Sequence, residues 1–540
     1  MQRWNSIRAL IFLMCLTCAS CATYEPFYSE GVKNWQNEIP DQNAVPDYSV
    51  FLIGGAGTAY TSEAVLSILE EQLSGAGKNS TAIFLGNQVY PKGLPDSTYR
   101  TWDKAHESLL PQLRILENYP GELIVIPGIR DWAGGKKEGL ENVRNQRKYM
   151  EDYLDKKKVF MPPKGRPGPE EIHLTNDIVV ILIDSYWWFH EYKKSYHGII
   201  DEADFFVQIE DAISRNRHKK IIFAASNPLY SVGNYGGYFA GTDNFFPLVR
   251  VNKALYIPLP GFLYTGFRKF LGGKQDLSNP HYQLLVEALQ ETFEGHSNII
   301  YASALEQNLQ YVERDSLHHI ISGAAGHTAY VAENDKTDYA QMQSGIARLD
   351  FYENGDVWLE FVTTEEEPAF RRLLFNKPVY NEKRIDQFLS NIDYSDSTVT
   401  TYPNGEKYQA SNYKKVYFGE NYREEWVITV EVPVFDFNKE KGGLEIVKKG
   451  GGGQTKSLRL ENDKEQQWVL RSLEKDPSKV IPEVVKMQLA IDLAQDQMSA
   501  YRPWAALSVP RLADAAEIYH TNPKIVYLTK DPRLGAYRDD

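Results

Sequence analysis

The fold is decided by the stretch Thr81-Ala82-Ile83-Phe84-Leu85-Gly86-Asn87-Gln88-Val89-Tyr90, in which an apolar β-type run ends at a glycine and a polar loop follows. Three more apolar runs, at residues 48–53, 123–126 and 221–225, also end at a loop. Their loops read Gly54-Gly55-Ala56-Gly57, Gly128-Ile129-Arg130-Asp131-Trp132 and Ser226-Asn227-Pro228. In layered α/β folds, loops at strand ends form the usual functional site.

Helical spacing of apolar residues covers residues 62–73 and 102–110, and Pro111 is expected to end or kink the second helix. Strands alternating with helices indicate α/β layers. Residues 178–183 read as a further buried strand. Closing strands are expected at residues 308–312, 318–322, 345–351 and 357–362.

The composition is that of a globular protein of two or three domains: 540 residues, 42% hydrophobic and 24% charged. The formal net charge is −13. Because nucleic-acid surfaces need basic patches to neutralise phosphates, no nucleic-acid partner is expected.

The N-terminus is typical of an exported protein. A basic start and a short apolar run at residues 9–16 indicate a signal peptide at residues 1–20. The small residues Ala19-Ser20 before Cys21 resemble a bacterial lipobox, so Cys21 is the expected lipidation site, carrying acyl chains such as palmitate. An ordinary signal peptide is the alternative. Residues 21–47 are polar and contain proline, as expected of a tether from the membrane to a domain.

The order of the motifs resembles that of the calcineurin-like metallophosphoesterases, and the text around them resembles a Bacteroidetes-type lipoprotein branch of that family. The resemblance covers residues 48–365. It implies a four-layer α/β/β/α sandwich and a site with two metal ions. Some longer relatives in that branch continue into an outer-membrane β-barrel, which implies an outer-membrane protein as partner.

The resemblance also marks positions where the family holds metal ligands or their helpers, and most carry other residue types here. Gly55 stands for the first aspartate, Asn87 for the bridging aspartate, and Ile129 for the ligating asparagine. Arg130 stands for the catalytic histidine, whereas Asp131 and Tyr90 match the family pattern. The remaining substituted positions are Ser226 and Asn227 in the fourth motif and Leu305 and Gln307 in the fifth. No metal and no catalytic residue is therefore expected.

Two readings of these positions stay open. A relocated site for Fe, Mn or Zn would have to draw on His318, His319, His327, Glu306 and Asp131, yet His318 and His319 point to opposite faces if they lie on a strand. Arg130 either neutralises a neighbouring carboxylate, which we favour because burying an unpaired Arg is costly, or binds an anion.

The rest of the chain divides into three parts. Residues 230–280 read as an insertion with an apolar helix face, which either packs on its own domain or meets a membrane or a partner. Residues 366–420 are expected to be a linker or helical segment, and residues 421–540 a smaller α+β domain. That domain has a Gly-rich loop, a hairpin turn or a weak phosphate or nucleotide site, formed by Gly450, Gly451, Gly452 and Gly453 with Lys475.

The sequence thus favours a lipoprotein of the outer membrane whose phosphoesterase-like domain is inactive and acts as a binding or accessory subunit of an outer-membrane assembly. A metal-dependent phosphoesterase with an unusual site, and a protein that binds a phosphorylated ligand without cleaving it, are the alternatives.

Overall fold

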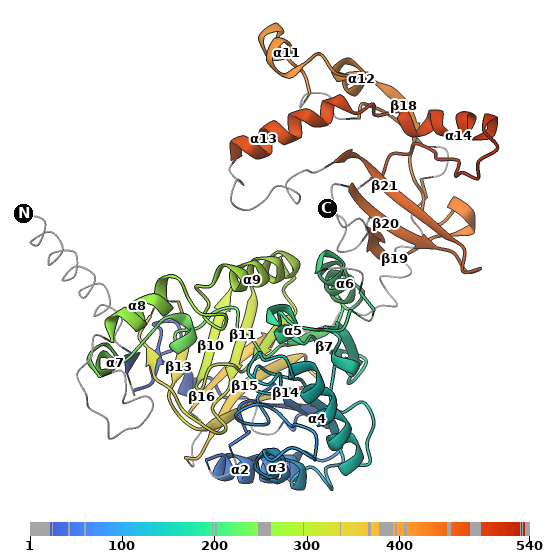
Figure 1. Ribbon diagram of the computed structural model, residues 1–540. Helices are drawn as coiled ribbons and strands as arrows, with labels where there is room; N and C mark the ends of the chain where they lie inside the picture. The colour runs from blue at the N-terminus through green and yellow to red at the C-terminus, as the bar shows by residue number, and fades with distance from the viewer. Residues whose placement is uncertain are drawn as a thin grey trace, which may run out of the picture. The chain divides into compact units, whose positions relative to one another are not determined.

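The computed structural model contains two compact units, residues 1–380 and 381–540 (Figure 1). It describes residues 22–534 except for a set of short stretches, which are 24, 41–43, 59–60, 197, 200–201, 247–260, 295, 335, 366–368, 377–392, 395–396, 404–407, 451–454, 476–487, 530 and 532. The predicted signal peptide 1–20, Cys21 and the loop residues Gly451, Gly452 and Gly453 therefore lie outside the described residues. No described helix is long and apolar enough to cross a membrane.

The first unit is built on two sheets. The larger has eight strands, in the spatial order β2 Phe27–Tyr28, β13 Tyr339–Gln341, β10 Leu309–Arg314, β11 Leu317–Ser322, β9 Ile299–Ser303, β8 Lys220–Ala224, β7 Ile178–Leu182 and β6 Glu170–His173. The smaller has six, in the order β16 Phe370–Asn376, β15 Asp356–Thr363, β14 Gly345–Phe351, β3 Tyr48–Ile53, β4 Ser80–Phe84 and β5 Glu122–Val125.

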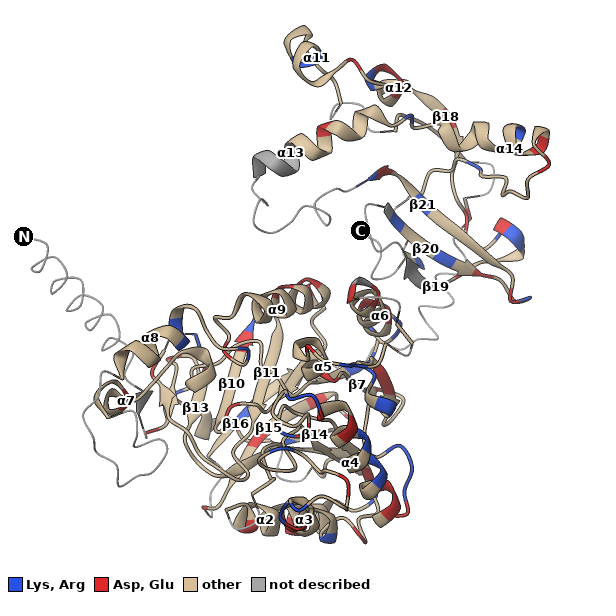
Figure 2. Cartoon of the chain, in the orientation of Figure 1, with Lys and Arg blue, Asp and Glu red and all other residues tan. Residues whose placement is uncertain are grey.

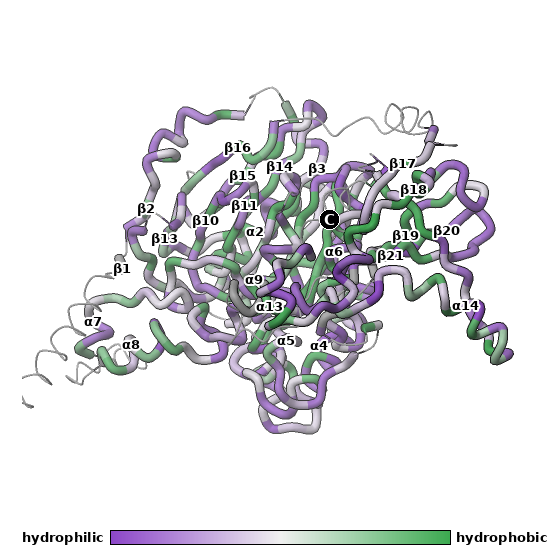
Figure 3. The backbone as a smooth tube through the Cα atoms, turned by 90° about the horizontal axis from the view of Figure 1, so that it is seen from above, coloured by the Kyte–Doolittle hydropathy of each residue, from purple (hydrophilic) through white to green (hydrophobic). Residues whose placement is uncertain are grey.

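The two sheets pack face to face because their strands are apolar on both sides. In β3, Val50 and Leu52 belong to the core between the sheets, whereas Phe51 and Ile53 face the outer helical layer. Figure 3 shows the hydrophobic tube segments gathered along these central strands. Strand β3 pairs in parallel with β4, and β4 in parallel with β5.

Helices cover the outer faces of the sheets. The helices α2 Glu63–Ala76 and α3 Trp102–Arg114 lie on the six-stranded side, with α4 Gly139–Tyr153 beside them (Figure 1). On the eight-stranded side lie α5 Ser185–Phe189, α6 Glu202–Arg215 and α9 Pro280–Phe293. Phe293 of α9 packs edge-on against Phe223 of β8 at 5.0 Å. The predicted four-layer α/β/β/α sandwich is confirmed.

One helix is longer than expected. The pattern predicted that Pro111 would end or kink the helix that begins at Trp102, but α3 includes Pro111 and continues to Arg114. The buried side chains of Leu109 and Leu113 on either side of the proline hold it against the core, so packing overrides the local preference.

The first unit also extends beyond the predicted bounds of 48–365. The supposed tether contributes β1 Ala22–Thr23, which pairs with β12 Val331–Ala332, and β2, which joins the larger sheet. Trp35, in the 3-10 helix Trp35–Asn37, is buried, and its ring centroid lies 6.0 Å from that of Phe370 in β16. The segment is polar on average, but it contains aromatic side chains that pack on the domain. Residues 21–47 are therefore not a free tether.

The second unit holds a two-stranded sheet, β17 Thr398–Thr401 with β18 Val430–Pro433. Its three-stranded sheet consists of β19 Glu445–Gly450, β20 Thr455–Glu461 and β21 Gln467–Lys475. The helices are α11 Asn412–Phe418, α12 Arg423–Val427, α13 Gln488–Gln497 and α14 Ala505–Ala515. Because β17 and α11 belong to this unit, much of the predicted linker 366–420 is part of a folded domain, and β16 belongs to the first.

Candidate functional site

The loops of the sequence motifs meet at one edge of the sandwich. Glycine makes this possible, because a Cβ on Gly86 would lie 2.7 Å from Ser226 Oγ and 2.9 Å from the Cα of Gly128. A Cβ on Gly54 would lie 2.1 Å from the Cβ of Ala304. The second, third and fourth motifs, which begin at Gly86, Gly128 and Ser226, are thus in contact. The first motif, which begins at Gly54, touches the fifth, which begins at Ala304.

Asp131 is the centre of this arrangement. Its carboxylate is buried and accepts hydrogen bonds from the backbone N–H groups of Asn87 at 2.7 Å, Gly128 at 2.8 Å, Gln88 at 3.1 Å and Val89 at 3.2 Å. Burial raises the pKa of Asp131 to about 6, against the lowering effect of these donors. The side chain therefore ties the second-motif loop to the third.

The two residues after Gly86 also bond the backbone. Asn87, with φ of 63°, accepts a hydrogen bond from the Arg130 N–H at its Oδ1, 2.9 Å away. Gln88 donates from Nε2 to the carbonyl of Ile126 at 3.2 Å. Both amides therefore stabilise the loop.

The fourth motif is fixed in a similar way. Asn227 Oδ1 accepts a hydrogen bond from Ser185 Oγ at 2.8 Å, and its carbonyl accepts one from the hydroxyl of Tyr301 at 2.7 Å. Ser226 is buried, and its Oγ finds no hydrogen-bond partner among the described residues. A lone hydroxyl is a poor ligand for Zn or Fe compared with the imidazole it replaces.

The remaining marked positions supply backbone or apolar groups. Gly55, with φ of 73°, donates its N–H to the carbonyl of Gly86 at 3.1 Å. Ile129 and Leu305 are buried in the outer core. Gln307 accepts a hydrogen bond from the Ala329 N–H at its carbonyl, 2.6 Å away. None of these contacts involves a side-chain group that binds a metal.

Glu306, considered for a relocated metal site, has a structural partner instead. Its Oε1 accepts hydrogen bonds from Ser231 Oγ at 2.7 Å, the Tyr235 N–H at 2.7 Å and the Gly236 N–H at 3.2 Å. Burial raises its pKa. The carboxylate thus holds the first residues of the insertion in place.

The three histidines do not form one site. In β11, His318 stacks on Tyr311 with ring centroids 6.1 Å apart, whereas His319 lies against Tyr301 at 5.1 Å on the opposite face. Burial lowers the pKa of His318 to about 4 and that of His319 to about 3. Across the described part of the chain, no three His, Cys, Asp or Glu side chains are grouped as metal ligands. The donor set does not fit the family's two-metal centre.

Arg130 occupies the position of the catalytic histidine and packs on an aromatic side chain. Its guanidinium carbon lies 5.2 Å from the ring centroid of Tyr90. His327 meets the same ring edge-on at 6.1 Å, and burial and the charge of Arg130 lower its pKa. No described carboxylate forms an ion pair with Arg130, so the favoured role of charge neutralisation finds no partner there.

Sequence reasoning missed Asp184 and Ser185. Trp132 Nε1 donates to Asp184 Oδ2 at 2.9 Å, and burial raises the pKa of Asp184 to about 8. Both residues follow directly after the predicted strand 178–183, the same strand-end position as every other motif. That position was the signal that could have found them.

In the second unit, Lys475 lies opposite Thr455 at the end of the β20–β21 pair. Its ammonium group sits 4.0 Å from the ring centroid of Tyr501. Gly450 ends β19 opposite Ser457. The described contacts of Lys475 are therefore those of a packed side chain.

No family profile matches the chain, and no curated protein matches it in sequence. The solved structures that it resembles share the metallophosphoesterase fold. One is GAP50, the anchor in the inner membrane complex of Plasmodium, with 13% identity, a TM-score of 0.40, and coverage of 64% of this chain and 94% of that chain. Another is the purple acid phosphatase PPD1 of yellow lupin (Lupinus luteus), with 12% identity, a TM-score of 0.37, and coverage of 60% and 53%.

A third is PhoD, with 8% identity, a TM-score of 0.34, and coverage of 63% of this chain and 74% of that chain. At such identities the likeness concerns the fold alone. The chemistry has to be judged on this chain's own residues.

Proposed function

We propose that this protein is an envelope lipoprotein whose phosphoesterase-like domain binds a partner instead of hydrolysing phosphate esters, as an accessory subunit of an outer-membrane assembly. The observation that supports this most directly is Asn87, which stands at the position of the bridging aspartate. Its side-chain oxygen accepts the backbone N–H of Arg130, at the place where a two-metal enzyme needs a free carboxylate.

The residue types at the other positions support the same proposal. A two-metal site generates its nucleophile from metal-bound water, so loss of the ligands removes the nucleophile as well. Gly55, Ile129 and Leu305 offer no donor side chain. Restoring one ligand would leave the others absent, so no single substitution is expected to create activity.

Exposed apolar side chains on the second unit support a role in binding. On α11, Tyr413, Val416 and Tyr417 are each exposed to 80% or more. Monomeric soluble proteins rarely leave such groups of side chains uncovered. An outer-membrane protein that docks on this helix is consistent with the predicted lipid anchor at Cys21.

The test is elemental analysis of the purified protein together with p-nitrophenyl phosphate turnover on the same sample, before and after incubation with Fe, Mn and Zn. We expect substoichiometric metal and no turnover, followed by co-purification of an outer-membrane protein after mild solubilisation. Two tightly bound ions per chain with turnover would refute the proposal and favour a metal-dependent phosphoesterase with an unusual site.

A second candidate function has one specific observation in its favour. Arg130 carries a charge that no described carboxylate neutralises, and Tyr90 holds its guanidinium at the strand-end site. Such an arginine suits an anion, because guanidinium groups bind phosphate through paired hydrogen bonds. The domain would then bind a phosphorylated ligand without cleaving it.

Thermal stabilisation by phosphate esters tests this candidate. The Arg130→Ala variant is expected to lose the shift that the wild type shows, whereas Arg144→Ala, which removes an exposed arginine from α4, should keep it. Equal shifts in the wild type and in Arg130→Ala would eliminate Arg130 as the anion-binding group.

A further inference from the structure

The insertion carries a helix that turns its apolar face outward. In α8 Phe262–Phe270 and the residue after it, the exposed fractions are 57% for Leu263, 47% for Tyr264, 49% for Phe267, 55% for Phe270 and 65% for Leu271. At 100° per residue these five side chains fall within one arc of about 120°. The arc contains no charged residue, and Figure 2 shows charge on α8 only toward its end.

The opposite side of α8 is firmly held. Thr265 and Gly266 are buried, and Thr265 Oγ1 donates to Asn244 Oδ1 at 2.6 Å, which joins α8 to α7 Gly241–Phe245. Phe245 of α7 is also exposed, to 41%. The helix is therefore packed on one side, as the sequence allowed, and presents the rest of its apolar surface outward.

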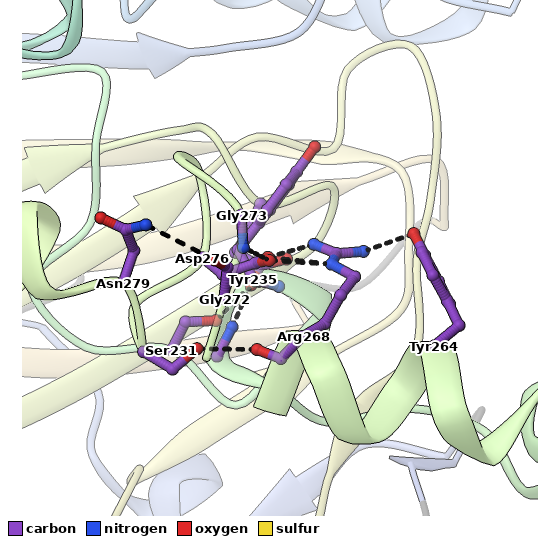
Figure 4. Close-up of polar contacts among 11 residues, drawn as sticks. Ser231, Tyr235, Tyr264, Arg268, Gly272, Gly273, Asp276 and Asn279 are labelled. Carbon is purple, nitrogen blue, oxygen red and sulfur yellow. Dashed lines mark hydrogen bonds and ion pairs between the residues drawn. The ribbon is translucent and has the colours of Figure 1, made fainter. Parts of the chain in front are cut away.

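The cation nearest the arc is neutralised. Arg268 Nε lies 3.0 Å from both carboxylate oxygens of Asp276, and its guanidinium carbon is 5.2 Å from the ring centroid of Tyr235 (Figure 4). Asp276 also accepts the Gly273 N–H at 2.7 Å. Because Asp276 neutralises Arg268, the charge of this arginine does not prevent the outer face of α8 from entering an apolar environment.

The position of α8 relates it to the N-terminus. Cys21 directly precedes β1, whose residues pair with β12 in the register Ala22 with Ala332. The Ala332 N–H in turn bonds the carbonyl of Val232 at 3.0 Å.

The same segment contacts α8 five residues after Val232, at Gly237. A Cβ on Gly237 would lie 3.2 Å from the Cα of Lys269 in α8, so the segment that bonds β12 also supports this helix. Figure 3 places β1, α7 and α8 at the same end of the domain.

We propose that the exposed arc of α8, with Phe245 beside it, rests in the interfacial layer of the lipid bilayer into which Cys21 is anchored. An amphipathic surface helix binds a bilayer in proportion to the apolar area that it buries, and an acyl anchor is strengthened by a second contact of this kind. The inference relies on the proposed lipid anchor for the orientation of the domain, but not on the loss of catalysis.

The test uses the mature chain, residues 21–540, with Cys21→Ser so that no acyl group contributes. Three proteins are floated with vesicles of phosphatidylethanolamine and phosphatidylglycerol. They are the chain with the wild-type arc, a Leu263→Glu/Phe267→Glu variant and a matched Val509→Glu/Leu512→Glu control. Val509 and Leu512 are exposed apolar residues of α14 in the second unit, at 53% and 70%. We expect the α8 variant to lose about tenfold in partitioning while the control is unchanged.

Three outcomes would overturn the proposal. The first is equal flotation of the α8 variant and the chain with the wild-type arc. The second is a lower melting temperature of the α8 variant, which would show that the face is packed within the chain. The third is an α8 variant that still binds vesicles but no longer co-purifies with a membrane protein. Acylation of Cys21 is measured separately, by metabolic labelling with a palmitate analogue in the full-length chain. Failure of that labelling would remove the anchor, whereas metal content and turnover test the proposed loss of catalysis.

Discussion

Asp131 Oδ2 accepts the N–H of Asn87 at 2.7 Å, so a carboxylate at the position of a catalytic helper in the motif resemblance bonds the backbone of the neighbouring motif. The same carboxylate bonds three further N–H groups, of Gly128, Gln88 and Val89. A buried acid that holds two loops together stabilises the fold, so its presence alone does not indicate activity.

Replacing Asp131 by Asn tests this role. An amide has one acceptor oxygen, and its NH₂ group would face backbone donors, so at least one pair of N–H groups loses its partner. We expect the free energy of unfolding to fall by about 3 kcal/mol, measured by denaturant unfolding. Asp103→Asn, an exposed residue of α3, is the control and should change it by less than about 0.5 kcal/mol. Equal stability of the two variants would contradict the role.

The contact of the first and fifth motifs depends on the absence of a side chain at Gly54. A Cβ there would lie 2.1 Å from Ala304 Cβ and 2.9 Å from the carbonyl oxygen of Ser322. We expect Gly54→Ala to destabilise the protein by about 3 kcal/mol, because both neighbours belong to sheet strands or their ends and cannot move freely.

The matched control for this prediction is Gly241→Ala, whose Cβ would meet nothing within 4 Å. That variant should keep the wild-type melting temperature. A Gly54→Ala protein as stable as Gly241→Ala would show that the two loops can separate without cost.

Stability should depend on pH through His319. Burial lowers the pKa of His319 from 6.5 to about 3, so between these values the unfolded chain binds a proton that the folded chain does not. The free energy of unfolding therefore falls as pH decreases from about 6.5 to about 4, by about 3 kcal/mol from this residue. In His319→Phe this part of the slope should disappear. An unchanged slope would assign the acid sensitivity to other groups.

The second unit has its own stabilising pair. Arg423 donates to Asp496 from two nitrogens, at 2.8 and 2.6 Å, and the side chains are only 2% and 8% exposed. Arg423→Lys removes the planar fork and leaves a buried carboxylate oxygen poorly paired, at a cost of about 2 kcal/mol. Hydrogen exchange of the α12 and α13 amides should rise accordingly.

The exposed pair Arg502 and Glu425 is the control for that measurement. Arg502 is 56% exposed, and Arg502→Lys should leave exchange unchanged, because solvent screens pairs of this kind. A similar increase in both variants would mean that the burial of Arg423 adds nothing.

The layers of the first unit could be predicted from the sequence because its central strands are continuous apolar runs. The stretch before Asn87 and the strand before Ser226 end at the same edge in any layered α/β fold, so their meeting was predictable as well. What the side chains do at that edge was not. Asp131 bonds backbone N–H groups that no residue pattern reveals, and Arg130 packs on Tyr90, with no carboxylate of the described residues paired to it.

Domain bounds were the weaker part of the prediction. Trp35 and Phe370 lie in polar surroundings in the sequence, so their segments read as tether and linker, yet the two rings pack together. Long-range pairing of this kind, over more than 300 residues, has no local signal.

With the lipid anchor proposed at Cys21, the pairing of β1 with β12 would also limit how far the domain can move from a bilayer. With Ala22 fixed in a sheet, an acylated Cys21 leaves no slack between lipid and protein. A domain anchored in this way would stay next to the bilayer surface. It would rotate about the membrane normal and diffuse in the plane, so it would encounter other molecules in two dimensions and at a fixed height above the bilayer.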